Sequence, residues 1–239
     1  MIKEITSKEN PRIKYALKLK EKKYRQEYQQ FLGESLKSLE LAIKANLVNE
    51  VFTLSYLDIP ENIVQYIVTK ELIKKLAASS NPEGVVFIAN IPEYKKDNLN
   101  KILYLEEIND PGNLGTLVRT ALAFNFDAVI TSSNSVSIYN EKALAAAKGA
   151  NYLIPVFSSD LSSIKNGHVV IATSLDIDSR PIDELGHYDK FILLLGNEAH
   201  GLSKEIILEA DIKVKIDINN IDSLNVGIAG GILMHHLSK

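Results

Sequence analysis

Residues 193–202 read Leu-Leu-Leu-Gly-Asn-Glu-Ala-His-Gly-Leu, at the end of an apolar run that begins at Phe191. An unbroken apolar run followed by glycine and polar residues predicts a buried strand that ends in a tight loop. Ser203 stands where it would cap a following helix. Ligands of open α/β sheets bind outside the carboxyl ends of the strands, so this loop is a candidate binding site.

Two further segments join an apolar run to a helical pattern in the same way. Residues 109–115 read Asn-Asp-Pro-Gly-Asn-Leu-Gly, and residues 223–226 read Ser-Leu-Asn-Val. Taken singly, each is also ordinary turn or helix-cap chemistry. Together they predict one site made of three loops.

After residue 100 the chain alternates strand and helix patterns. The predicted strands are 102–105, 128–130, 152–157, 169–172, 191–195 and 214–216. The predicted helices are 114–124, 141–148, 160–166, 182–185, 204–210 and 224–237. This alternation predicts an α/β fold with a mostly parallel sheet and helices on both faces. Small residues fill the last helix over 226–232, which indicates close packing against another backbone or subunit.

The first part of the chain has shorter elements. We expect a helix over 8–30, with Asn10 as its cap and Pro11 at the first helical position, and then a strand over 31–33 and a helix over 34–46. The apolar run 84–89 predicts a buried strand. The polar segment 90–101 then separates two predicted domains, residues 1–95 and 96–239.

The composition is that of an ordinary globular protein. Of 239 residues, 46% are hydrophobic and 24% charged, which leaves ample material for a core. No apolar run reaches the roughly 18 residues of a membrane span, and no signal-peptide core follows the first residues. The chain has no cysteine, which excludes thiolate metal sites, and its five histidines show no metal spacing. We therefore expect a cytoplasmic protein without a metal or a membrane partner.

Charge and cofactor motifs narrow the choice of function. The net charge is −3, yet residues 1–28 hold nine Lys and Arg against four Glu, so the remainder is acidic. Such a basic arm can contact the phosphates of a nucleic acid, although a solvated amphipathic helix is the simpler interpretation of charge alone. No G-x-G-x-x-G follows the first strand of the alternating part, and no G-x-x-x-x-G-K-[ST] is present, which argues against a Rossmann dinucleotide site and a P-loop.

Arg119 is the charged residue of an otherwise apolar helical run, with Gly115, Thr116 and Ala123 beside it. Small neighbours leave room for a guanidinium near a ligand. A structural ion pair is the alternative, and Glu198 is a plausible partner for Arg119 through a bidentate bond. Asn113 and Arg119 lie about 120° apart and about 9 Å along a helix, so they share a site only if Asn113 lies at the cap or in the loop.

The three segments, in this order, resemble the three signature motifs of the SpoU–TrmH family of RNA ribose methyltransferases, within the knotted SPOUT class. Residues 33–35, Gly-Glu-Ser, followed by a helix, are similar to the opening of a small ribosomal-protein-like substrate-binding domain found upstream in many members. The chain departs from the family pattern at Asp217, where proline is usual, and at Gly227, where serine or a small apolar residue is usual.

The resemblance implies transfer of a methyl group from S-adenosylmethionine to a ribose 2′-hydroxyl of ribosomal or transfer RNA. It also implies a deep trefoil knot at the C-terminus and a homodimer whose active site draws on both subunits. At the family's cofactor positions stand Thr173, Leu195, Gly196, Asn197, Ile216, Ile218 and Leu224. At its catalytic and orienting positions stand Asn113, Arg119, Glu198, Ser223 and Asn225.

Two other functions stay open. One is a non-catalytic RNA-binding module with the same fold, against which the retained polar motif residues argue. The other is a methyltransferase that acts on an RNA base, as other knotted classes do. Within the leading hypothesis, Arg119 is either a base or an orienting group, and the second is favoured because a guanidinium stays charged.

Overall fold

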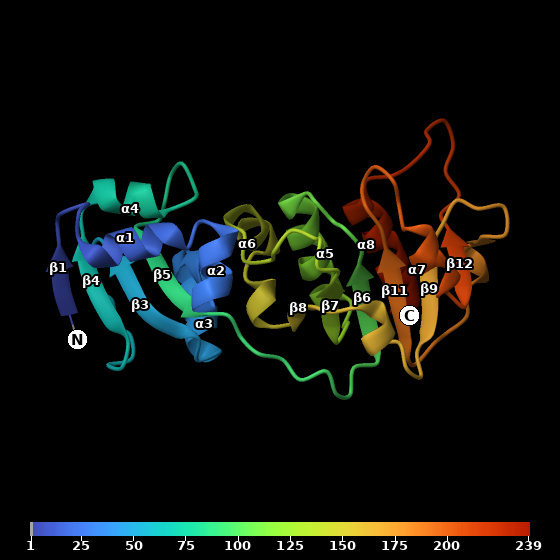
Figure 1. Cartoon of the computed structure of the whole chain (residues 1–239), viewed down its shortest axis with the longest axis horizontal. Coiled ribbons are helices and arrows are strands. Elements are labelled where there is room, and N and C mark those ends of the chain that lie inside the picture. The colour runs from blue at the N-terminus through green and yellow to red at the C-terminus, as the bar shows by residue number, and fades with distance from the viewer. Residues whose placement is uncertain (1) are drawn as a thin grey trace.

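The computed structural model describes residues 2–239, and it contains two β-sheets that lie side by side along the long axis of the molecule (Figure 1). Residues 91–100 connect them as an extended segment that runs along one edge (Figure 1). The passage from one sheet to the other thus falls within the polar segment 90–101.

The first sheet is mixed, with the strand order β1-β4-β3-β5-β2. Its strands are β1 (Ile2–Ile5), β2 (Gln30–Glu34), β3 (Val48–Thr53), β4 (Val64–Val68) and β5 (Val85–Asn90). β4 runs parallel to β1 and β3, whereas β5 runs antiparallel to β2 and β3. We call this sheet and its helices the first half of the molecule, and the second sheet with its helices the second half. The α-helices of the first half are α1 (Pro11–Lys18), α2 (Lys22–Tyr28), α3 (Leu36–Lys44) and α4 (Lys70–Leu76).

Three of the four α-helices described in this half, all except α2, begin at a side-chain cap. Asn10 caps α1, with Pro11 at its first position, as the sequence predicts. Ser35 caps α3 and Thr69 caps α4. In each case a side-chain oxygen satisfies an N–H group that the first helical turn leaves free.

The single helix predicted over 8–30 is wrong, because the chain turns at residues 19–21 and forms α1 and α2. Arg25 holds the turn. Its Nη1 donates to the carbonyls of Leu19 (3.1 Å) and Lys20 (2.7 Å), which are groups that the end of α1 leaves free. Arg25 is 5% exposed, and burial lowers its pKa, against a smaller opposite effect of Glu141. A residue that looks solvated in the sequence therefore stabilises the corner between two helices.

The second sheet has the order β10-β12-β9-β11-β6-β7-β8, and all its strand pairs are parallel. Its strands are β6 (Lys101–Leu105), β7 (Ala128–Thr131), β8 (Val156–Ser158), β9 (Val169–Thr173), β10 (Arg180–Pro181), β11 (Phe191–Leu195) and β12 (Ile212–Lys215). The α-helices of this half are α5 (Pro111–Ala123), α6 (Glu141–Ala147), α7 (Lys204–Leu208) and α8 (Val226–Leu237). The predicted α/β fold with a parallel sheet is confirmed.

Three predicted elements of this half differ from the structure. Residues 152–157 do not form one strand: η1 (Ala150–Tyr152) is a 3-10 turn, and β8 begins after Pro155, which has no N–H to donate to a sheet. The helices predicted over 160–166 and 182–185 are the single 3-10 turns η2 (Leu161–Ser163) and η3 (Ile182–Glu184). Each of these turns contains a single apolar residue, so neither has the repeated apolar positions that would hold a longer helix.

Alternate residues of the parallel strands pack on opposite faces of the second sheet. In β11, Phe191, Leu193 and Leu195 belong to one buried cluster, together with residues of α5 and α8. Ile192 and Leu194 belong to another, with residues of η2 and α7 packed against it. Because both faces are covered, the strand sequence is apolar without alternation.

A buried aromatic seam joins the two halves, formed by Phe31, Tyr139 and Tyr152. Phe31 of β2 is fully buried, and its ring centre lies 4.6 Å from that of Tyr139 and 6.3 Å from that of Tyr152. Burial raises the pKa of both tyrosines well above its usual value, so both phenols stay neutral. Within residues 2–239, no helix is both long and apolar enough to cross a membrane.

Candidate active site at the carboxyl ends of the parallel strands

A cavity of about 610 Å³ lies at the carboxyl ends of β9, β11 and β12. Its volume is in the range of pockets that hold small-molecule ligands. All seven residues expected at cofactor positions line it: Thr173, Leu195, Gly196, Asn197, Ile216, Ile218 and Leu224. Glu198, Ser223 and Asn225 line this first cavity too, whereas Asn113 and Arg119 are not among its lining residues.

The loop after β11 is closed by its own hydrogen bonds. The Asn197 and Gly201 backbones exchange two bonds, of 3.0 and 2.9 Å. The Asn197 side chain accepts from the N–H groups of Ala199 (2.8 Å) and His200 (3.3 Å) and donates to the Glu107 carbonyl (2.9 Å). Hydrogen bonds within the protein therefore form this wall of the cavity without a ligand.

Gly196 lets this loop return against the end of β11. A Cβ at Gly196 would lie 2.1 Å from the carbonyl carbon of Gly201 and 2.2 Å from the nitrogen of Leu202. Both are backbone atoms, which cannot rotate away as a side chain can. Gly196 is thus required by the close approach of two chain segments.

The Glu198 carboxylate connects this loop to the start of α5. It accepts from the N–H groups of Asn109 (3.3 Å) and Asp110 (3.1 Å) and from Asn113 Nδ2 (3.1 Å). Burial raises the pKa of Glu198, but the bonds from Asn113 and from backbone N–H groups outweigh it. The net pKa lies below its usual value, so the group is ionised at neutral pH.

Asn113 extends the connection to the third segment. Its Oδ1 accepts from Asn225 Nδ2 (3.0 Å), while its own Nδ2 donates to Glu198. Asn225 caps α8, since its Oδ1 accepts from the N–H groups of Gly227 (2.9 Å) and Ile228 (3.3 Å). We call the chain Glu198–Asn113–Asn225 the motif network, because it joins all three segments that the sequence singles out.

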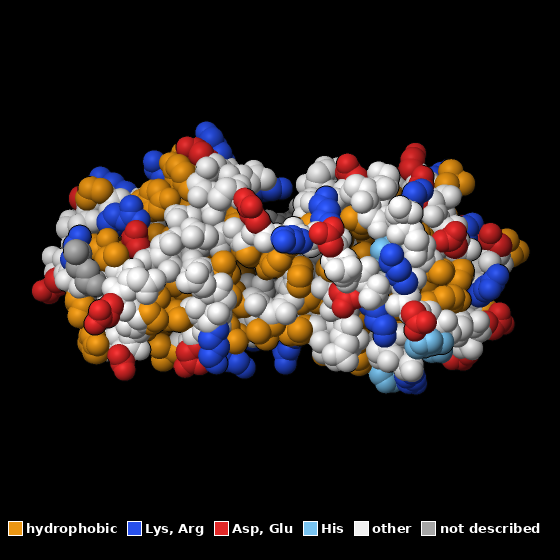
Figure 2. Space-filling model, turned by 90° about the horizontal axis from the view of Figure 1, so that it is seen from below, with side chains coloured by type: hydrophobic (Ala, Val, Ile, Leu, Met, Phe, Trp, Pro, Cys, Tyr) orange, Lys and Arg blue, Asp and Glu red, His pale blue; other side chains and the backbone are white. Residues whose placement is uncertain are grey.

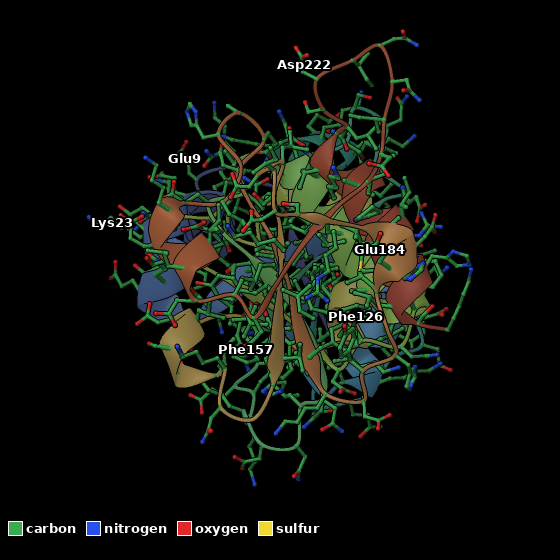
Figure 3. The ribbon with its side chains drawn as sticks, turned by 90° about the vertical axis from the view of Figure 1, so that its right-hand side faces the viewer. Glu9, Lys23, Phe126, Phe157, Glu184 and Asp222 are labelled. Atoms are coloured by element: carbon green, nitrogen blue, oxygen red, sulfur yellow. The ribbon has the colours of Figure 1, made fainter. Side chains whose placement is uncertain are left out.

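Ser223 lies on the approach to the first cavity. It is exposed, two residues before the Asn225 cap, and it lines the cavity. The loop to which it belongs carries Asp222 well out from the body of the molecule (Figure 3). The structure therefore places Ser223 on a protruding edge of the site.

The expected pairing of Arg119 with Glu198 is not formed within one chain. Within residues 2–239 Arg119 forms no ion pair, it is exposed, and it lines a second cavity. Because α5 begins at Pro111, Asn113 lies inside its first turn, and Arg119 follows more than a turn later on another side. Asn113 and Arg119 therefore do not share a site within one chain.

The second cavity, also of about 610 Å³, lies between the two halves. Figure 2 shows the surface hollowed between them, with charged side chains at the rim. Six cations against three carboxylates line this cavity: Lys20, Arg25, Lys37, Arg119, Lys142 and Lys148 against Glu34, Glu83 and Glu141. The excess of positive charge favours an anionic ligand.

The sequence analysis missed part of the loop after β9. Asp176 lines the first cavity and binds Lys213 Nζ at 3.1 Å, and the same ammonium binds Asp178 at 3.0 Å. The hydrogen bond from Lys213 lowers the pKa of Asp176. The available signal was two aspartates shortly after a predicted strand, four and six residues beyond its end at residue 172. No group of three or more His, Cys, Asp or Glu side chains in the described residues is arranged to hold a metal ion.

Two family models match the chain. Residues 100–235 match the SpoU rRNA Methylase family, and residues 10–86 match the MRM3-like substrate binding domain. A Bacillus subtilis protein named 23S rRNA (guanosine(2553)-2′-O)-methyltransferase RlmP is 30% identical, and the alignment covers 99% of each chain.

Solved structures match over the full length. An AdoMet-bound rRNA methyltransferase from Sinorhizobium meliloti has a TM-score of 0.90 at 27% identity, covering 99% of this chain and 97% of that one. A protein described as an RNA 2′-O ribose methyltransferase has a TM-score of 0.81 at 25% identity, covering 98% and 97%.

We expect Gly196→Ala to weaken S-adenosylmethionine binding about tenfold or more, because the added Cβ displaces the backbone of Gly201 and Leu202. Isothermal titration calorimetry measures this. Gly186→Ala is the matched control, since a Cβ there has its nearest neighbour at 3.7 Å. An unchanged dissociation constant in Gly196→Ala would contradict the role of the close approach.

We expect Glu198→Gln to destabilise the protein by about 1 kcal/mol at pH 7, a modest value because the side chain is solvent-exposed. The pKa of Glu198 is depressed by folding, so its contribution is present above the unfolded value, near 4.5, and is lost as pH falls through the folded value. Urea unfolding at pH 7 and pH 3 measures this, with exposed Glu184→Gln as control. An equal difference between wild type and Glu198→Gln at both pH values would argue against an ionised Glu198.

Proposed function

The chain belongs to the SpoU rRNA methylase family, and we propose that it methylates a ribose 2′-hydroxyl of 23S ribosomal RNA. It is an S-adenosylmethionine-dependent RNA methyltransferase. The observation that carries the proposal is the motif network, which joins three family segments at the edge of one cavity. The full-length match to the Bacillus subtilis enzyme makes the guanosine equivalent to 2553 the first candidate.

The first cavity fits the cofactor. Leu195, Ile216, Ile218 and Leu224 offer apolar contact, and the closed loop after β11 supplies a preformed wall. The carboxylates of Asp176 and Glu198 stand among the lining residues and complement a cation. When bound, S-adenosylmethionine supplies an electrophilic methyl group on its sulfonium.

The chain's own contribution is orientation. A ribose hydroxyl is a poor nucleophile, so it would have to be held toward the electrophilic methyl group that the bound cofactor would supply, and its proton would pass to solvent water. The motif network fixes the three loops around this point. Arg119 orients the hydroxyl or a neighbouring phosphate, since its charged guanidinium donates hydrogen bonds and does not accept them.

We also propose a homodimer with composite active sites. α8 leaves Ile228 57% and Ile232 39% exposed, beside α5, which presents Arg119. The prediction that the small residues of α8 pack against another subunit needs a correction at Gly230. A Cβ at Gly230 would lie 2.5 Å from Leu117 Cδ2 of the same chain, so this glycine serves packing within the subunit. The two isoleucines supply the free apolar area, and a partner would bring its Arg119 to the first cavity.

Three further features complete the proposal. Residues 1–95 form the RNA substrate-binding domain, supported by the match over 10–86, and residues 96–239 form the methyltransferase domain. The C-terminal segment forms the trefoil knot of the SPOUT class, supported by the loops 196–202 and 218–226 that share one cavity before α8 packs on β11. The proposed location is the cytoplasm, where it would meet ribosomal RNA.

The direct test is methylation of unmodified 23S rRNA by the purified protein with labelled S-adenosylmethionine. We expect one ribose methylation, mapped as protection of the following phosphodiester from alkali, because a 2′-O-methyl group cannot attack it. Label without alkali protection would assign the activity to a base. Cofactor binding without any transfer would favour the non-catalytic alternative.

We expect Arg119→Ala to lower the single-turnover rate about 100-fold, with cofactor affinity unchanged and little rescue in Arg119→Lys. Lys190→Ala, at an exposed cation of the second half, is the control. A mixture of Arg119→Ala and Gly196→Ala subunits should regain part of the activity, because a mixed dimer contains one intact composite site. Near-normal turnover in Arg119→Ala would reject its catalytic role, and absence of recovery would reject the shared site.

A further inference from the structure

Three tyrosine rings of α1 and α2 form a stack, which we call the tyrosine ladder (Tyr15, Tyr28 and Tyr24). The ring centres of Tyr15 and Tyr28 lie 5.0 Å apart, and those of Tyr28 and Tyr24 lie 5.9 Å apart. The planes of each pair are within 28° of parallel. All three rings are only partly buried, so the ladder has a solvent-facing side.

The turn at residues 19–21 creates this ladder. In one continuous helix, Tyr15 and Tyr28 would stand about 20 Å apart along the axis. The turn held by Arg25 brings them into contact, and Tyr24 follows on α2 at the i, i+4 spacing from Tyr28.

The two ends of the ladder differ. At one end the Arg12 guanidinium lies 4.6 Å from the centre of the Tyr15 ring and is paired with Glu50, so this end is closed. At the other end the ammonium groups of Lys18 and Lys23 lie 5.2 and 5.6 Å from the centre of the Tyr24 ring. Both lysines are exposed, and within residues 2–239 neither forms an ion pair. Figure 3 shows Lys23 at the edge of the molecule, pointing into solvent.

The ladder lies in the basic part of an otherwise acidic chain. Residues 1–28 carry nine Lys and Arg against four Glu, while the whole chain has a net charge of −3. A partly exposed tyrosine ring approached by exposed, unpaired lysines matches a base with its flanking phosphates. A double helix does not fit, because its bases are already stacked on each other and their faces are covered.

We propose that the tyrosine ladder binds an unpaired segment of the RNA substrate, with a base stacked on Tyr24 and the adjacent phosphates on Lys18 and Lys23. This inference rests on the proposed function, since it names the form of RNA that the enzyme holds. The ladder is in the first half of the chain and the first cavity in the second. It therefore anchors a flank of the substrate, away from the nucleotide that is methylated.

The test is fluorescence anisotropy with a labelled, unstructured oligouridine and a labelled RNA duplex of the same length. We expect Tyr24→Ala to weaken oligouridine binding about 5- to 100-fold, the range for one stacked base, and to leave duplex binding within twofold of wild type. Tyr24→Phe keeps the ring and should bind like wild type. The double variant Lys18→Ala/Lys23→Ala should lower the slope of log affinity against log salt by about 0.7 for each lysine.

Two measurements distinguish a loss of RNA binding at the ladder from a loss of folding and from a loss of catalysis. In Tyr24→Ala, KM for RNA should rise while kcat and the dissociation constant of S-adenosylmethionine stay unchanged. Wild-type affinity of Tyr24→Ala for oligouridine would overturn the proposal, as would equal losses for oligouridine and duplex. If the wild-type protein binds oligouridine through Tyr24 but does not methylate ribose, the ladder proposal stands and the proposed function is rejected.

Discussion

The ionised carboxylate of Glu198 is the group on which the geometry of the site depends. Asn113 is 85 residues from Glu198 and 112 from Asn225 in the sequence, so no local interaction sets the distances among them. A carboxylate accepts several hydrogen bonds at once, and free N–H groups at the start of a helix point toward the same side. One acceptor thereby fixes the start of α5, and through Asn113 it fixes the start of α8.

The charged surfaces of the molecule differ in sign and therefore attract different ligands. The first cavity is lined by two carboxylates, Asp176 and Glu198, against one lysine, Lys215, whereas the second cavity and the tyrosine ladder have an excess of cations. A small cationic ligand and a large polyanion are therefore drawn to different places on one chain. The exposed position of Arg119 on α5, away from its own first cavity, belongs to the polyanion side of this division.

Much of the site could be predicted from the sequence, because parallel strands put their carboxyl ends at one edge and the polar segments follow those ends. Which site residues contact one another could not be predicted. Arg119 and Asn113 lie on different sides of α5 because of where this helix begins, and the Asp110 cap sets that start. The corner between α1 and α2 was missed for a similar reason. Arg25 acts through carbonyls of a neighbouring turn, a tertiary contact that periodicity does not contain.

The aromatic seam bears on how such a chain can evolve. Phe31 comes from the first half, and the two tyrosines that cover it come from the second. Protein interiors are close-packed, so a foreign first half would meet these rings with the wrong shape. Recombination of whole modules between lineages is thus constrained, because the two halves must be inherited together with a matched seam. Exposed residues on α1 and α2 can change more freely, because their substitution leaves the seam intact.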